Sequence, residues 1–283
     1  MSPARRSRTK GDATGMYQSA KIINMQDILK IGGKEITNRL FIGTGKFGSF
    51  QLMKQALEAA RAQVVTVALR RVNAQDKQDN ILEYIPKDCT IMANTSGARN
   101  CDEALRLARL TKAIGGSNWV KIEVIPDNKY LMPDNEETLK AVEILAKEGF
   151  QVFPYMNPDL VMARKMRDAG AAAIMPLGSP IGTNRGFKTQ EIVRLMVKEI
   201  ELPVIVDAGL ALPSHLAECM EMGCAAVLVN TAVAIAKDPV VLARAFSYAV
   251  EAGRLAYLSS SGNASDIARA SSPLTGFLHN ENV

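Results

Sequence analysis

The 283-residue chain has little of several residue types, and each shortage excludes a class of protein. It has only two histidines, and its four cysteines (Cys89, Cys101, Cys219 and Cys224) form no C-x-x-C pair, so we expect no metal site. Reduced cysteines of this kind are typical of a cytosol-like compartment. No uninterrupted apolar run approaches the roughly 18 residues of a spanning helix, so we expect a soluble protein without a membrane partner.

The chain also carries little net charge. Its 34 basic and 29 acidic residues give +5, and more than half of this excess lies in the first 15 residues. The nearly balanced remainder argues against a DNA or RNA partner. Residues 1–26 lack the apolar segment of a secretory signal, and we interpret them as a basic, flexible leader of a cytoplasmic protein. The alternative is a transit peptide that directs the protein to a plastid.

Short β-rich runs alternate with longer amphipathic stretches from about residue 40 onward. Eight runs predict strands: 40–45, 64–70, 90–97, 119–125, 151–156, 172–178, 203–209 and 225–232. Eight is the number that closes a parallel barrel, so we predict one α/β domain, a (β/α)8 TIM barrel over residues 27–258. The polar, serine-rich residues 259–283 are expected to form a flexible loop and C-terminal tail.

An open doubly wound sheet is the competing architecture. Gly43, Gly45 and Gly48 have the G-x-G-x-x-G spacing of a dinucleotide site. No acidic residue ends the next predicted strand, where the ribose would need a partner, so the barrel is favoured.

The starts of several helices can also be predicted. Ser49 and Asp134 are expected to cap two helices, because their side chains can accept hydrogen bonds from first-turn N–H groups. Asn157 followed by Pro158 predicts another helix that begins at the proline, and Pro213 predicts a further one.

The fourth predicted strand carries charged residues where apolar ones are expected. Val120, Ile122 and Val124 form an aliphatic face suited to the helix layer. Lys121 and Glu123 share the opposite face and should therefore project into the barrel. Burial can favour the neutral form of a lysine, which makes the amine a nucleophile toward a ketone or aldehyde. We therefore predict a Schiff-base lysine, and the alternative is a structural ion pair.

Other polar residues stand at the carboxyl ends of predicted strands. Asp207 ends the seventh strand on the face opposite its valines, where a polar residue of a barrel is typically catalytic. The alternative is that Asp207 caps the following turn. Arg70, Arg71 and Asn94 also lie at strand ends, and the sequence assigns them no role.

The loops after the last three strands have the composition of a phosphate site. Glycines let backbone N–H groups approach an anion closely, and asparagine and threonine add neutral donors. The loops after strands seven and eight are those where barrel enzymes most often bind phosphate. We predict that five residues bind a sugar phosphate: Gly178, Ala208, Gly209, Asn230 and Thr231.

Long motifs connect these residues to a known family. They include FIGTGKF, TVALRRVN, NTSGARNCDEA, WVKIEVIPDNKYLMPDNEETLKAVEILAKEGFQVFPYMN, AAIMPLGSPIGTNRG, LPVIVDAG and AAVLVNTAVAIAKDPV. Over about residues 27 to 277 the chain resembles the thiazole synthases of thiamin biosynthesis. It departs from their pattern in LALPSH, where IGTPSD is typical, and at Ala98, where a cysteine is usual.

The resemblance implies a specific reaction. Lys121 would form an imine with the C2 ketone of 1-deoxy-D-xylulose 5-phosphate, and Glu123 and Asp207 would be the acid/base pair. Sulfur would arrive as the C-terminal thiocarboxylate of a small sulfur carrier protein, and condensation with dehydroglycine would close the thiazole ring without a cofactor. The resemblance also implies a homotetramer.

Two rival functions remain open from the residues alone. One is another Schiff-base barrel, such as an aldolase-like or a pyridoxal-phosphate-synthase-like enzyme. The other is a barrel that binds a phosphate metabolite as a scaffold or regulator.

Overall fold

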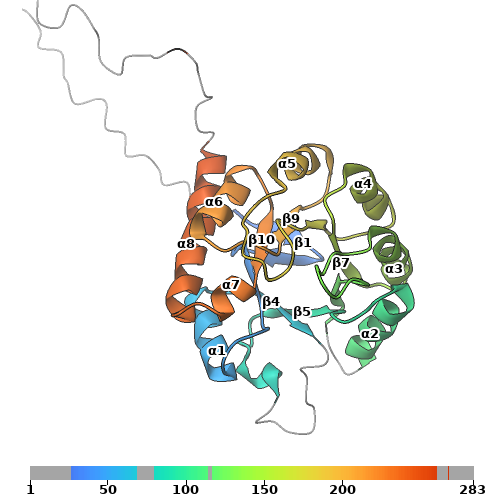
Figure 1. Cartoon of the computed structure of the whole chain (residues 1–283), viewed down its shortest axis with the longest axis horizontal. Coiled ribbons are helices and arrows are strands. Elements are labelled where there is room, and N and C mark those ends of the chain that lie inside the picture. Colours follow the sequence, from blue (N-terminus) through green and yellow to red (C-terminus); the bar gives the residue numbers. More distant parts are fainter. Residues whose placement is uncertain (1–26, 69–79, 114–116, 260–266, 268–283) are drawn as a thin grey trace, which may run out of the picture.

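The chain folds into a closed barrel of eight parallel strands surrounded by helices. The computed structural model describes residues 27–68, 80–113, 117–259 and 267. Figure 1 shows the helices as an outer ring around the strands. The architecture confirms the predicted (β/α)8 barrel, and the open doubly wound sheet is wrong.

The barrel strands alternate with helices along the chain. The strands are β3 (Leu40–Gly43), β4 (Val64–Ala68), β5 (Thr90–Asn94), β6 (Trp119–Ile122), β7 (Gln151–Met156), β8 (Met175–Pro176), β9 (Ile205–Asp207) and β10 (Ala226–Val229). Around the barrel, neighbouring strands follow the order β8-β7-β6-β5-β4-β3-β10-β9. Parallel bridges from Ile174 to Val204 and from Leu177 to Asp207 join β8 to β9 and close the ring. Each strand lies within a segment that the sequence predicts to be one.

Eight α-helices and one 3₁₀ helix complete the described elements. They are α1 (Phe50–Ala59), η2 (Ile81–Tyr84), α2 (Cys101–Ala113), α3 (Asn135–Lys147), α4 (Leu160–Asp168), α5 (Gln190–Glu199), α6 (Pro213–Glu221), α7 (Thr231–Ala234) and α8 (Pro239–Leu258). No helix in this part of the chain is long and apolar enough to cross a membrane.

The predicted helix starts are confirmed with one exception. Ser49 Oγ accepts a hydrogen bond from Leu52 N, and Asp134 caps α3 in the same way. The start at Pro158 is wrong, because Asp159 caps α4 through Met162 N. The side chain of Asn157 is instead bound to the loop before α3, where its amide donates to the Pro133 carbonyl at 2.9 Å, and Asp159 supplies the cap.

A short antiparallel hairpin that the sequence analysis missed precedes the barrel. Its strands, β1 (Leu29–Ile31) and β2 (Lys34–Ile36), are joined by Gly32 and Gly33, both with positive φ. Two such residues form the tight turn that hairpins favour. The Trp119 indole N–H donates to the Gly32 carbonyl at 3.0 Å, and the hairpin crosses the middle of the ring in Figure 1. It therefore closes one end of the barrel.

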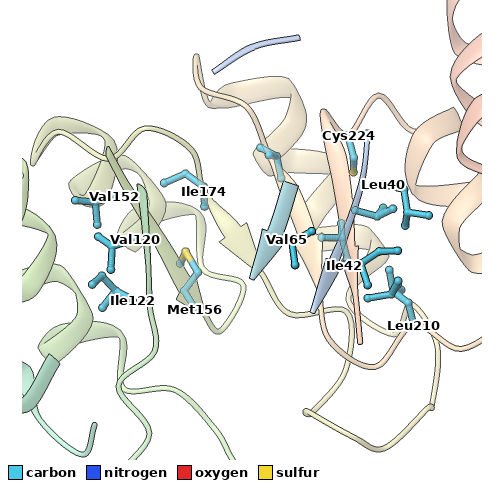
Figure 2. Close-up of a cluster of buried hydrophobic side chains, with 14 of the residues drawn as sticks. Leu40, Ile42, Val65, Val120, Ile122, Val152, Met156, Ile174, Leu210 and Cys224 are labelled. Carbon is cyan, nitrogen blue, oxygen red and sulfur yellow. The ribbon is translucent and has the colours of Figure 1, made fainter. Parts of the chain in front are cut away.

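The two faces of the strands form two separate apolar clusters. The outer face packs on the helices, and Figure 2 shows part of this layer, including Val120 and Ile122 of β6 and Val152 of β7. The inner cluster fills the barrel next to the hairpin with Phe41, Val64, Met92, Trp119, Phe153, Met175 and Ile205. Because alternate residues face inward, the next inner positions toward the strand carboxyl ends form a second layer, which contains the polar residues Thr66, Asn94, Lys121 and Asp207.

Candidate active site

Lys121 lies inside the barrel between two carboxylates. Its Nζ is 2.8 Å from Glu123 Oε1 and also forms an ion pair with Asp207 Oδ2. The three side chains are 5, 8 and 4% exposed, respectively. The prediction that Lys121 of β6 and Glu123, the residue after β6, face the barrel interior is therefore confirmed. The structure adds Asp207, the last residue of β9, to the same ion-pair network.

The charges of this network hold Lys121 protonated. Burial by itself lowers the pKa of Lys121, but the adjacent Asp207 and Glu123 carboxylates raise it by more, so its pKa lies above the ordinary value. The expectation of a neutral amine is wrong for the resting site, because the attraction of two carboxylates exceeds the cost of burying the ammonium.

The pKa of Asp207 is raised, which favours its role as a proton acceptor. Burial raises the pKa of its carboxyl, and Glu123 adds a repulsive negative charge. Lys121 and the Ala208 N–H oppose this shift, yet the pKa stays above its ordinary value. A buried carboxyl with a raised pKa can take the proton that a lysine must lose before it acts as a nucleophile.

The backbone of Glu123 is anchored from the neighbouring strand. The buried Thr95 Oγ1 donates to the Glu123 carbonyl at 2.9 Å, and the Glu123 N–H donates to the same hydroxyl oxygen at 2.8 Å. This reciprocal pair extends the contact between β5 and β6 beyond the last ladder residue, Lys121. The carboxylate is therefore presented from a fixed backbone.

A cavity of about 640 Å³ opens above the ion-pair network. Lys121, Glu123 and Asp207 line it together with Ala208 and Gly209. The volume lies within the roughly 300–1,000 Å³ of typical small-molecule sites. The arrangement can therefore hold a small substrate against a buried amine that has two proton acceptors beside it.

The turn after β9 has an unusual backbone. Ala208 and Gly209 both adopt positive φ, of 65° and 74°. A Cβ on Gly209 would lie 1.9 Å from Ser179 Oγ, so only glycine fits there. This turn brings the main chain close to the loop after β8, at the rim of the cavity.

Four of the five predicted substrate-binding residues line this cavity: Ala208, Gly209, Asn230 and Thr231. Gly178 is not among the lining residues. Its N–H donates to the Asp207 carbonyl and its carbonyl accepts from Lys188 N, both at 2.8 Å. A Cβ on Gly178 would lie 3.0 Å from the Ala208 carbonyl oxygen, so this glycine permits the close approach of the two loops. Direct substrate contacts of all five residues stay predictions.

The structure also brings residues to the cavity that the sequence analysis missed. Lys46, in the FIGTGKF motif, lines it with a positive φ of 67°, and Arg99 lines it from the loop after β5. A Cβ on Gly182 would lie 3.2 Å from Lys46 Nζ and 3.9 Å from Thr231 Oγ1, which locates this ammonium near the predicted phosphate rim. Lys46 and Arg99 both lie in loops that follow barrel strands, and this position was the sequence feature that could have predicted their place at the cavity.

Of the three residues to which the sequence assigned no role, the one that the structure describes lies at the cavity. Asn94 lines the cavity and pairs in register with Lys121, and its Oδ1 accepts a hydrogen bond from Ser96 N. Arg70 and Arg71 lie outside the described residues. Among the described residues, no cluster of three or more His, Cys, Asp or Glu side chains could hold a metal ion.

The chain is similar to known proteins over most of its length. The model of the family "Thiazole biosynthesis protein ThiG" matches residues 30–273. A thiazole synthase of Pelotomaculum thermopropionicum is 64% identical over 254 residues, which cover 90% of this chain and 99% of the relative. A thiazole synthase of Desulforamulus reducens is 60% identical over 257 residues, or 91% of this chain and all of the relative.

The chain is also similar to solved structures. The chain resembles one in the crystal structure of the Amycolatopsis orientalis BexX/CysO complex, with 33% identity, a TM-score of 0.73, and coverage of 85% of this chain and 98% of that one. The 3-hexulose-6-phosphate synthase of Salmonella typhimurium, at 17% identity and a TM-score of 0.54, shares the fold alone over 75% of this chain and 98% of that one. The chain therefore belongs to the ThiG family of thiazole biosynthesis proteins, the family of the thiazole synthases.

Proposed function

We propose that this thiazole synthase condenses 1-deoxy-D-xylulose 5-phosphate, dehydroglycine and carrier-bound sulfur into thiazole phosphate carboxylate, through a Schiff base on Lys121. The observation that carries the proposal is the buried Lys121 ammonium, held by Glu123 and Asp207 at the base of a cavity inside the barrel. A buried amine at the base of a cavity is suited to capture a ketone, because imine formation releases water.

The first step is a proton transfer within the ion-pair network. Lys121 starts as an ammonium, which is not nucleophilic, and passes one proton to Asp207. The raised pKa of Asp207 lowers the cost of this transfer, whereas the raised pKa of Lys121 opposes it. The neutral amine then adds to C2 of the pentulose, and the carbinolamine loses water as the protonated imine forms.

The second step uses the electron demand of the iminium. A carboxylate of Glu123 or Asp207 removes the proton at C3, and the electron pair of that C–H bond neutralises the iminium nitrogen as an enamine. Proton return then moves the carbonyl character from C2 to C3. Glu123, with its backbone anchored to Thr95, is well placed to act repeatedly from one position.

The rim of the cavity would hold the phosphate. Gly209 would supply a backbone N–H group, and Asn230 and Thr231 would supply neutral side-chain donors. Ala208 would line the phosphate site while its own N–H stays bound to the Asp207 carboxyl. Gly178 would act by allowing the close approach of these loops. The phosphate is remote from the reacting carbon, and its binding energy would be used to position that carbon beside Lys121.

We further propose that sulfur arrives on the thiocarboxylate terminus of a sulfur carrier protein. The support is the similarity to a chain in the BexX/CysO complex, together with the open mouth of the cavity at the rim loops. We also propose a homotetramer in the cytoplasm. All four cysteines are free, as is usual in a reducing compartment.

Borohydride trapping tests the central step. Incubation with 1-deoxy-D-xylulose 5-phosphate and borohydride should add the reduced pentulose phosphate to Lys121, which peptide mass spectrometry locates. Lys121→Ala should give no adduct, whereas Lys46→Ala, which removes another cavity lysine, should still be labelled at Lys121. Normal labelling of Lys121→Ala would refute the assignment.

The two rival functions give different results in the same preparation. A scaffold that only binds the sugar phosphate would show no mass gain after reduction. Another Schiff-base enzyme would form the adduct but would leave a sulfur carrier thiocarboxylate intact when dehydroglycine is supplied. Consumption of the thiocarboxylate together with thiazole formation is the expected outcome.

A further inference from the structure

Tyr155 of β7 is a buried polar residue next to the lysine that the proposed steps do not use. Its side chain is completely buried, and the ring centroid is 5.1 Å from Lys121 Nζ. Its strand lies between β6, which carries Lys121 and is followed by Glu123, and β8, whose next residue, Leu177, is bridged to Asp207. Lys121, Glu123 and Asp207 are thus the charged groups that the strands around Tyr155 bring toward it.

The hydroxyl of Tyr155 has no hydrogen-bond partner among the described residues. Buried hydroxyls of tyrosine almost always find a partner, so an unpaired one needs an explanation. Thr138 Oγ1 is also buried and unpaired, but it belongs to α3 in the outer helix layer. In the barrel interior, Tyr155 Oη is therefore a donor that the resting site leaves unused.

Formation of the imine reduces the number of hydrogen-bond donors available to the two carboxylates. The Lys121 ammonium carries three N–H donors and serves both Glu123 and Asp207. The protonated imine keeps only one N–H, so at least one buried carboxylate loses a donor. A buried carboxylate oxygen that loses its donor is costly, and a nearby unused O–H is the natural replacement.

We infer that Tyr155 is a positioning residue that donates its hydroxyl to the Asp207 carboxylate once Lys121 is consumed in the imine. This inference rests on the proposed Schiff-base function. Asp207 is the chosen partner because its buried Oδ2 accepts no hydrogen bond from a described residue and is held by the ion pair with Lys121, which imine formation alters. The hydrogen bond keeps Asp207 charged and oriented while the C3 proton of the bound sugar is removed.

The inference separates two measurable steps. Tyr155→Phe keeps the ring beside Lys121 and removes only the unpaired hydroxyl, so borohydride trapping with 1-deoxy-D-xylulose 5-phosphate should proceed at the wild-type rate. Exchange of the C3 hydrogen for deuterium in D2O, followed by NMR without a sulfur donor, should slow by roughly tenfold or more, as expected when a hydrogen bond to a charged group is lost. Tyr84→Phe is the matched control, since Tyr84 packs on Phe50 outside the barrel and should leave both rates unchanged.

The pH profile of C3 exchange provides a second measurement. A hydrogen bond to the charged form lowers a carboxyl pKa, so its loss in Tyr155→Phe should move the acidic limb of the profile to higher pH. A purely structural role of the hydroxyl would not move this limb.

Three results would overturn the inference. They are unchanged C3 exchange in Tyr155→Phe, an equal loss of trapping and exchange, and a slower exchange with an unmoved acidic limb. Absence of trapping in the wild-type protein is a different result, because it contradicts the proposed function itself.

Discussion

Replacing Lys121 with methionine should destabilise the barrel in a pH-dependent way. Methionine fills the apolar space of the lysine stem but leaves Glu123 and Asp207 buried without their cation. Removing one partner of a buried ion pair typically costs about 3–5 kcal/mol. At roughly 2–4 °C per kcal/mol for a domain of this size, the midpoint of thermal unfolding should fall by about 6–20 °C at pH 7.5.

The sign of the pH dependence follows from Asp207. Burial and the charge of Glu123 already raise the pKa of Asp207, and loss of Lys121 removes the main opposing effect. A group whose pKa is higher in the folded than in the unfolded state stabilises the fold below the unfolded pKa, near 4, and this stability is lost as the pH rises through the folded value. The deficit of the variant should therefore shrink between pH 7.5 and pH 5. Lys121 itself stays charged across this range in the wild type, because its pKa is raised.

Circular dichroism at both pH values would measure this deficit. Lys147→Met is the matched control, because Lys147 pairs with Glu143 on the surface of α3 and is 73% exposed. Such a pair is worth less than about 1 kcal/mol, so the control should unfold close to the wild type. Adding Asp207→Asn to Lys121→Met should restore much of the loss, since one of the facing charges is gone. An equal deficit at pH 5 and pH 7.5 would show that the buried charges are not its cause.

Three further predictions follow from individual contacts. Asp207→Asn should still bind the sugar phosphate while steady-state turnover falls by roughly 100-fold or more, as for a lost acid/base; unchanged turnover would remove Asp207 from the mechanism. His215→Ala should cost about 1 kcal/mol in urea unfolding, because His215 Nδ1 accepts from the N–H groups of residues 211 and 212 at 3.2 Å, whereas His215→Asp, the residue typical of the family motif, should retain the cap and the stability. Asp27 is bound by Arg254 and Arg39, which lower its pKa to about 2. The free energy of unfolding of the wild type should therefore fall by about 1–2 kcal/mol as the pH drops from 4 to 2. Asp27→Asn should lack this part of the acid dependence, and the same pH slope in both proteins would contradict the prediction.

The fold was accessible from the sequence because its repeating unit is local. Alternation of apolar residues with period two predicts strands, and the amphipathic stretches between them predict helices. Eight such units closed by short connections leave few topologies other than a barrel. The hairpin of β1 and β2 escaped prediction because three-residue strands carry too short a pattern, although Gly32 and Gly33 mark its turn.

The location of the lysine was likewise a local inference. Val120, Ile122 and Val124 pack outward, so Lys121 and Glu123 face inward by alternation alone. The charge state of Lys121 was not local. The sequence suggested a neutral amine from burial, but the pKa depends on Asp207, which reaches Lys121 only because the ring closes between β8 and β9.

The sequence by itself determined the family, the order of strands and helices, and the face on which each strand residue lies, because these depend on patterns within about ten neighbouring residues. Only the tertiary structure decided which side chains meet inside the ring. It brought Asp207 to Lys121, Lys46 near Thr231, and the unpaired Tyr155 hydroxyl to the same interior. The physical reason is that electrostatic and hydrogen-bond energies depend on distances across the barrel, which no local pattern encodes.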